Sequence, residues 1–148
     1  MIVNKYRELK KKHQEEVNKF PFMFAFDKKQ FAEGMKKLGL NENDTDKIYD
    51  IGYGGYIRKT DSDKLDEMYS RHDKELKKAI EDDLTGEGFI YDMFNYELSN
   101  HEYCVTYDVG DTLNALGFSI DDINNDKRLL HGLQLATKNQ HEQHEMYL

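Results

Sequence analysis

The stretch Tyr96–Asp108, YELSNHEYCVTYD, contains the residues of this chain best suited to chemistry. It holds the single cysteine of the sequence, Cys104, with His101 three positions before it and the carboxylate Asp108 after it. A cysteine nucleophile needs a histidine within hydrogen-bonding range, a setting that favours the thiolate, and a third group to orient the histidine. The candidate chemical site is therefore His101, Cys104 and Asp108, together with His72 from an earlier segment.

The charges around the cysteine argue against catalysis. Glu97, Glu102 and Asp108 surround Cys104 in the sequence. Nearby negative charge disfavours a thiolate and raises the pKa of the thiol. We therefore expect a packed, inert thiol and assign no catalytic residue.

Two further motifs resemble ligand-binding loops without completing them. The run GYGGYIRKT at 52–60 lacks the Gly-Lys-Ser/Thr sequence that a phosphate-binding loop places at the start of a helix. The run DDLTGEGFIYDMF at 82–94 partly matches a calcium loop, but Phe94 stands where the bidentate carboxylate is required. We predict no cofactor at either place.

The histidines near the end of the sequence are the remaining candidates for metal binding. His141 and His144 lie three residues apart with a glutamate after each, but they do not form an HExxH motif. One cysteine also cannot build a zinc framework of the usual kind. We expect 139–148 to be a loose C-terminal tail, and we predict no metal site.

Hydrophobic periodicity predicts the elements that would position these residues. Apolar side chains at helical spacing indicate an amphipathic N-terminal helix over 1–20 and a long helix over 62–83, and a nearly all-apolar run indicates a buried helix over 89–100. Aromatic and β-branched residues at 22–26 and 48–58 predict a small β element, in which the run FPFMFAF is a buried extended segment.

The fold expected from these elements is α+β and mainly α. It is a compact bundle of six or seven helices with a small two- or three-stranded β element, in a single domain over 1–148. The length of 148 residues suits one domain. No apolar run reaches the roughly 20 residues that cross a bilayer, the start of the sequence lacks a secretory signal, and a lone cysteine suits a reducing compartment. We therefore expect a cytoplasmic protein with no membrane partner.

The charge distribution points to the class of partner. The net charge is −8, and residues 41–111 carry 8 Lys and Arg against 19 Asp and Glu. Nucleic-acid binders place basic side chains against phosphates, so we expect no direct nucleic-acid binding and a protein partner with a basic, nucleic-acid-binding surface. The candidate contacts are Asp61, Asp63, Asp66, Glu67, Glu81, Asp82 and Asp83. The same residues also fit a solvated helix face that keeps the protein soluble.

Several runs also resemble a known family: FDKKQFAEGMKKLGL, GYGGYIRKTD, TGEGFIYDMFNYELSNHEYC and DTLNALG. Together they resemble small, acidic, largely uncharacterised proteins carried by phages, plasmids and integrative elements of Firmicutes. The resemblance covers roughly residues 15–138 and includes no catalytic signature. It implies a mobile genetic element, a setting in which small acidic proteins counter host defence as anti-CRISPR or antirestriction factors.

Together these observations predict a non-enzymatic protein-binding factor. It would inhibit a host nucleic-acid-handling defence complex through an acidic surface. The alternative is a small enzyme, or a metal- or ligand-binding sensor, that uses the region of His101, Cys104 and Asp108. The oligomeric state is left open, since exposed tyrosines such as Tyr53, Tyr56 and Tyr103 could serve an interface or the core.

Overall fold

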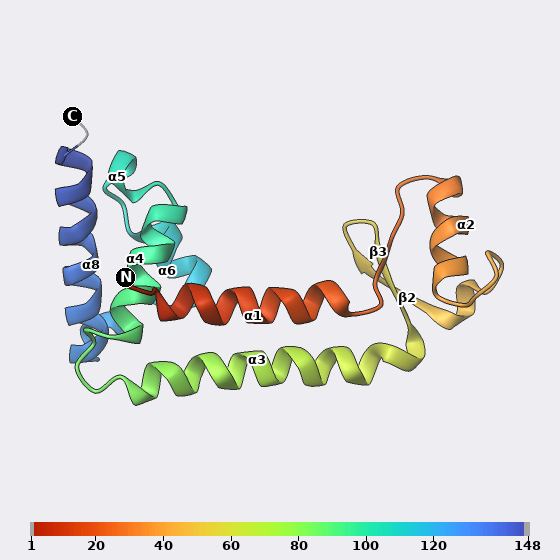
Figure 1. Ribbon diagram of the computed structural model, residues 1–148, viewed down its shortest axis with the longest axis horizontal. Helices are drawn as coiled ribbons and strands as arrows, with labels where there is room; N and C mark the ends of the chain where they lie inside the picture. The colour runs from red at the N-terminus through yellow and green to blue at the C-terminus, as the bar shows by residue number, and fades with distance from the viewer. Residues whose placement is uncertain (1, 147–148) are drawn as a thin grey trace. The chain divides into compact units, whose positions relative to one another are not determined.

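The computed structural model describes residues 2–146 and groups the chain into two compact units. The helical unit comprises 1–13 and 75–148, and the sheet unit comprises 14–74. The boundary falls inside two helices labelled in Figure 1, α1 (Lys5–Lys19) and α3 (Ser62–Asp82). The single domain over 1–148 stays a prediction, and the structure distinguishes these two compact units within it.

The helical unit is built around α4 (Phe89–Asn100) and α8 (Lys127–Met146), which pack against each other. Its remaining short helices are α5 (Tyr103–Thr106), α6 (Gly110–Leu116) and α7 (Ile120–Asn124). The side chains of α4 that are fully buried are Ile90, Met93, Phe94 and Leu98. The predicted buried helix at 89–100 is confirmed.

The end of α8 differs from the expectation of a loose tail. Residues 139–146 form the last turns of this helix, while 147–148 lie outside the described residues. Leu133, Ala136 and Gln140 continue a buried stripe along α8. This stripe packs the C-terminal segment against its neighbours, which polar composition alone does not reveal.

The small β element predicted from 22–26 and 48–58 is confirmed: it is a sheet of three antiparallel strands, and their order is β1-β3-β2. They are β1 (Met23–Phe24), β2 (Ile48–Gly52) and β3 (Gly55–Arg58). Two short 3₁₀ helices, η1 (Thr45–Lys47) and η2 (Lys59–Asp61), flank the hairpin. The helix α2 (Lys28–Lys37) follows β1, and the Asp27 side chain caps it by accepting the Gln30 N–H at 2.7 Å.

The two faces of this sheet are covered to different extents. One face packs on α2 through Met23, Ala25, Met35, Leu38 and Ile48. The helix lies close because Gly34 has no side chain: a Cβ there would be 2.1 Å from Met23 Cγ. The other face is covered at one end, where Ile57 packs with residues of α3 and of the α1 end.

The fold is α+β and mainly α, as the sequence predicts. Residues 2–146 contain eight α-helices where six or seven are expected, and α5 and α7 have only 4 and 5 residues. Within the same residues, no helix has the length and apolar character needed to cross a membrane.

Candidate functional site

The residues of the predicted chemical site belong to both compact units. His72 belongs to the sheet unit, whereas His101, Cys104 and Asp108 belong to the helical unit. Cys104 is half-buried in α5, and Asp108 Oδ1 accepts the Gly110 N–H at 2.8 Å in a local turn. Within residues 2–146, no hydrogen bond or ion pair joins His101, Cys104 and Asp108 to one another.

The two histidines of that proposed site have other neighbours. His72 is buried, its Nε2 lies 3.5 Å from Glu16 Oε1, and its ring meets Tyr69 edge-on. His101 follows the last residue of α4, and its Nε2 lies 3.8 Å from Glu97 Oε2. Each histidine therefore faces a glutamate of its own unit.

Glu97 is a buried carboxylate that sequence reasoning did not select. It is 4% exposed on α4, and its Oε1 lies 3.4 Å from Lys10 Nζ. That ammonium also lies over the rings of Tyr6 and Tyr96, 5.7 and 5.5 Å from their centroids. Burial raises the pKa of Tyr6, and the charge of Glu97 adds to the rise. The available signal is a glutamate placed at helical spacing from the apolar residues Phe94 and Met93, three and four positions before it.

The second half of the stretch Tyr96–Asp108 is a packed turn that contacts the last turns of α8. Tyr103 is buried, and its hydroxyl lies 2.9 Å from His141 Nε2. The Tyr107 ring stacks on His141 with centroids 4.8 Å apart. Glu102 and Tyr107, on either side of α5, have positive φ angles of 56° and 55°, which are uncommon without glycine. His141, expected in a loose tail, is instead part of this packing.

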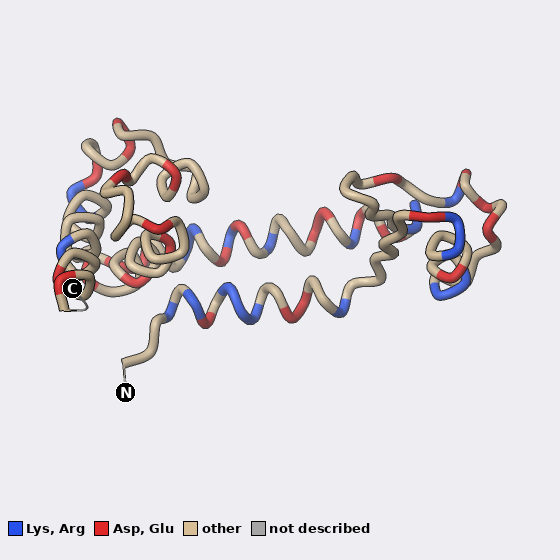
Figure 2. Tube along the Cα trace, turned by 90° about the horizontal axis from the view of Figure 1, so that it is seen from above, with Lys and Arg blue, Asp and Glu red and all other residues tan. Residues whose placement is uncertain are grey.

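The acidic residues of the sheet unit are only partly available as a surface. Asp63, Asp66 and Glu67 are exposed on α3. Asp61 is 6% exposed, and its Oδ2 lies 2.7 Å from Arg58 Nε. The expectation that Asp61 is an exposed partner contact is therefore wrong. Lys and Arg alternate with Asp and Glu along α3, as Figure 2 shows. This helix therefore presents mixed charge rather than a purely acidic face.

The other three acidic candidates lie in the helical unit. Glu81 and Asp82 are exposed, and Asp82 pairs with Lys78 at 3.0 Å. Asp83 instead holds the turn into α4, where its carboxylate accepts N–H groups from Thr85, Gly86, Gly88 and Ile90. Burial alone would raise the pKa of Asp83, but these amides outweigh it and lower that pKa. Asp83 is thus a structural residue.

The turn held by Asp83 also explains the glycine-rich run that partly resembles a calcium loop. The guanidinium of Arg128 donates to the carbonyls of Ile80 and Asp83 at 3.0 and 2.8 Å and so caps α3. No group of three or more His, Cys, Asp or Glu side chains in the described part of the chain is placed to hold a metal ion.

The sheet unit has several exposed aromatic and aliphatic side chains. Alternate residues of the FPFMFAF run point to opposite sides: Met23 and Ala25 are buried, whereas Phe24 and Phe26 are 60% and 78% exposed. The buried segment expected here is therefore exposed on one side. Phe22, half-buried, and Phe24 form a ring contact at 5.9 Å.

Residues of β2 extend this surface. Tyr49 and Ile51 are exposed, and a Cβ placed on Gly55 would touch both Ile51 and Phe24, so these two side chains meet above it. We call Phe24, Phe26, Tyr49 and Ile51 the apolar face. Of the three tyrosines considered for an interface, Tyr53 is 98% exposed at the hairpin turn, Tyr56 is half-buried and Tyr103 is buried.

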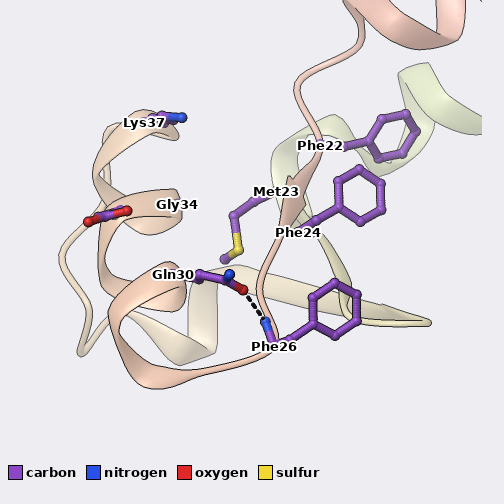
Figure 3. A pocket seen from close by; sticks show the side chains of 8 residues that line it. Phe22, Met23, Phe24, Phe26, Gln30, Gly34 and Lys37 are labelled. Carbon is purple, nitrogen blue, oxygen red and sulfur yellow. Dashed lines mark hydrogen bonds between the residues drawn. The ribbon is translucent and has the colours of Figure 1, made fainter.

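A groove of about 460 Å³ runs between β1 and α2. Figure 3 shows the rings of Phe22, Phe24 and Phe26 on one side of the strand and Met23 pointing toward α2 on the other. The α2 wall consists of Gln30, Glu33, Gly34 and Lys37. The α2 wall of the groove is therefore largely polar, and the phenylalanine rings lie on the side of β1 that faces away from α2.

Comparison with known proteins places the chain in a family. A model described as a family of unknown function (DUF7659) matches residues 5–139, which includes all of the sheet unit and most of the helical unit. No curated protein and no solved structure matches the chain. Because the family model covers most of its length, the chain belongs to the DUF7659 family, whose function is unknown.

Proposed function

We propose that this protein is a non-enzymatic protein-binding factor and that the apolar face of the sheet unit binds the partner. The observation that supports this is the exposure of Phe24, Phe26, Tyr49 and Ile51 together on one small sheet. Contiguous exposed apolar surface is costly in water and commonly marks an interaction site. Large aromatic side chains are also enriched at the energetic centres of protein interfaces.

The distribution of reactive groups supports binding over catalysis. Glu97 is paired with Lys10, and Tyr103 is hydrogen-bonded to His141. A catalytic acid, base or nucleophile must be able to reach a substrate. No comparable observation favours the alternative of a small enzyme or sensor. Within residues 2–146, no hydrogen bond or ion pair joins His101 to Cys104.

A more specific form of the proposal is inhibition of a host nucleic-acid-handling defence complex by a mobile-element protein. The sequence resemblance suggests that setting, and exposed Asp63, Asp66 and Glu67 on α3 could meet a basic surface. Complementary potentials speed association and displace phosphate from such surfaces. The interleaved lysines weaken this field, so we rank the acidic contact below the apolar one.

The experiment is a comparative pull-down from lysate of a Gram-positive bacterium that carries CRISPR and restriction systems. The baits are the wild type, a Phe24→Ser/Phe26→Ser variant and an Asp63→Lys/Asp66→Lys/Glu67→Lys variant, each at low and high salt. Folding of each bait is checked by circular dichroism. Mass spectrometry then reports which partners are near-stoichiometric.

We expect a partner that the wild type retains and the phenylalanine variant loses at both salt concentrations. A partner lost by the acidic variant, and by the wild type at high salt, would support the acidic contact instead. If every protein retained by the wild type is retained equally by both variants, neither surface binds the partner and the proposal fails.

A further inference from the structure

The backbone N–H groups on the two edges of β1 and the residues after it have different hydrogen-bond partners. The Ala25 N–H donates to Gly54 O of the hairpin at 2.9 Å. The Phe26 N–H donates to Gln30 Oε1 of α2 at 2.8 Å, as the dashed line in Figure 3 shows. Successive N–H groups of a strand point to opposite sides. The Phe24 N–H therefore points to the same side as that of Phe26, away from β3.

The pairing register leads to the same assignment. Phe24 lies opposite Gly55, and Met23 lies opposite Tyr56. Since Ala25 is hydrogen-bonded to Gly54, the antiparallel alternation makes the pair of Phe24 and Gly55 the one without mutual hydrogen bonds. Both the N–H and the C=O of Phe24 thus face the groove at the free edge of β1.

The neighbouring helix α2 has a net positive charge, and its residues Glu33 and Lys37 line the groove. The ten residues of α2 carry Lys28, Lys29, Lys36 and Lys37 against Glu33, a net charge of +3. These five side chains are all exposed. A second copy of this helix at the same groove would be repelled, whereas an acidic segment would be attracted.

We infer that the groove between β1 and α2 binds an extended, acidic segment of another protein, which adds to the edge of β1 as a fourth strand. The Phe24 N–H and C=O supply the central pair of main-chain hydrogen bonds. Alternate side chains of the segment are apolar, toward the phenylalanine rings, and acidic, toward Lys37 and its neighbours. Strand addition is an established mode of peptide recognition at sheet edges. The inference rests on the proposed protein-binding function and names the partner's chemistry.

A single-stranded nucleic acid is the main competing occupant, because exposed rings beside lysines can stack bases. The peptide fits better because Phe24 presents both an N–H donor and a C=O acceptor at the strand edge, which match the backbone of another peptide strand. The competing occupant is kept as an outcome of the test.

The test begins with selection of random 12-residue peptides displayed on phage against the purified full-length protein. We expect enrichment of sequences in which apolar residues alternate with Asp or Glu. Affinities of the selected peptides are then measured for the wild type, Phe24→Ala and Phe24→Pro. Alanine removes the ring and keeps the N–H, whereas proline removes the N–H as well. Proline is tolerated at a strand edge whose N–H points outward.

Strand addition predicts that Phe24→Pro weakens binding about tenfold or more beyond Phe24→Ala. It also predicts that the Phe24 amide hydrogen in the wild type exchanges more slowly when peptide is bound. This second measurement decides the matter if the proline variant fails to fold. A Lys36→Glu/Lys37→Glu variant should weaken acidic peptides and leave their neutral Asn/Gln counterparts within about twofold.

Equal affinities for Phe24→Pro and Phe24→Ala, with no protection of the Phe24 amide, would overturn strand addition while leaving the apolar face as a binding surface. Failure to enrich alternating acidic peptides would also overturn the inference, and the lysate comparison would still decide the proposed function separately. Tighter binding of a labelled oligothymidylate than of any selected peptide, lost in Phe24→Ala, would assign the groove to nucleic acid instead.

Discussion

The turn around Tyr103 and the strand around Phe24 use aromatic side chains in opposite ways. Tyr103 is buried, hydrogen-bonded to His141, and flanked by residues with positive φ that the packing holds in place. Phe24 is exposed on a strand whose edge is open to the groove. The first region uses groups capable of chemistry to complete a core, and the second leaves apolar groups in water. The proposed protein-binding function rests on this contrast.

The largest loss of stability is expected for Gly86→Ala, in the tightly packed helical unit. Gly86 has φ +87°, and a Cβ there would lie 2.2 Å from the backbone oxygen of Arg128. We expect a loss of about 3 kcal/mol or more in the free energy of unfolding, from left-handed strain plus overpacking. Chemical denaturation measures it.

Gly117→Ala is the matched control for that substitution. Gly117 also has a positive φ, +78°, but a Cβ there meets nothing within 4 Å. It should lose only the cost of left-handed backbone, about 1–2 kcal/mol. Equal losses for the two variants would show that the contact with Arg128 is unimportant.

The next effect concerns Asp83→Asn, which weakens the turn between α3 and α4. We expect a loss of about 1–2 kcal/mol at pH 7, as for other capping carboxylates. The pKa of Asp83 is lowered below its ordinary value of 3.8 in the folded protein, because the surrounding amides outweigh the opposing effect of burial. Its contribution is therefore present above pH 3.8 and is lost as the pH falls through the lower folded value.

Urea denaturation at a series of pH values measures this dependence. The difference in stability between the wild type and Asp83→Asn should shrink as the pH falls below about 4. The exposed Asp82→Asn, one residue away, is the control. A gap for Asp83→Asn that stays constant down to pH 2 would mean that the charge of Asp83 does not stabilise the turn.

A smaller effect is expected for Tyr103→Phe, which keeps the ring and removes the hydroxyl that contacts His141. The loss should be about 1 kcal/mol, the usual net value of a hydrogen bond. Tyr53→Phe, at a 98% exposed position, should change nothing measurable. Thermal unfolding compares the two, and equal melting temperatures would show that the hydroxyl contact does not hold α8.

The smallest effect on stability is expected in the sheet unit. The Phe24→Ser/Phe26→Ser variant should unfold within about 0.5 kcal/mol of the wild type, because exposed side chains contribute little to folding. Its fluorescence enhancement of anilinonaphthalene sulfonate should nevertheless fall. A stability loss above about 2 kcal/mol would place these rings in the core and remove the contrast.

The sequence predicts where the helices and strands lie better than it predicts which of their side chains are buried. Periodicity indicates α4 as buried and places the β element at the correct residues, since both signals are local. It misplaces the exposure of Phe24 and Phe26, because an all-apolar run does not say which side a helix covers. Here α2 covers only the side of Met23 and Ala25.

The candidate sites depend even more on contacts distant in sequence. Spacing brought His101 and Cys104 to attention, but the partner of Tyr103 is His141, 38 residues later. Asp61 is in an acidic run and still buries its carboxylate beside Arg58. Such pairings follow from tertiary packing, which composition and local pattern do not contain.

The division of the chain has a consequence for its synthesis. The sheet unit is one continuous run, 14–74, whereas the helical unit joins 1–13 to 75–148. A ribosome therefore completes the sheet unit while Lys10 still lacks Glu97, which is translated 87 residues later. The N-terminal segment must wait for the rest of its core, so we expect the inner segment to fold first during translation and the two ends to fold last.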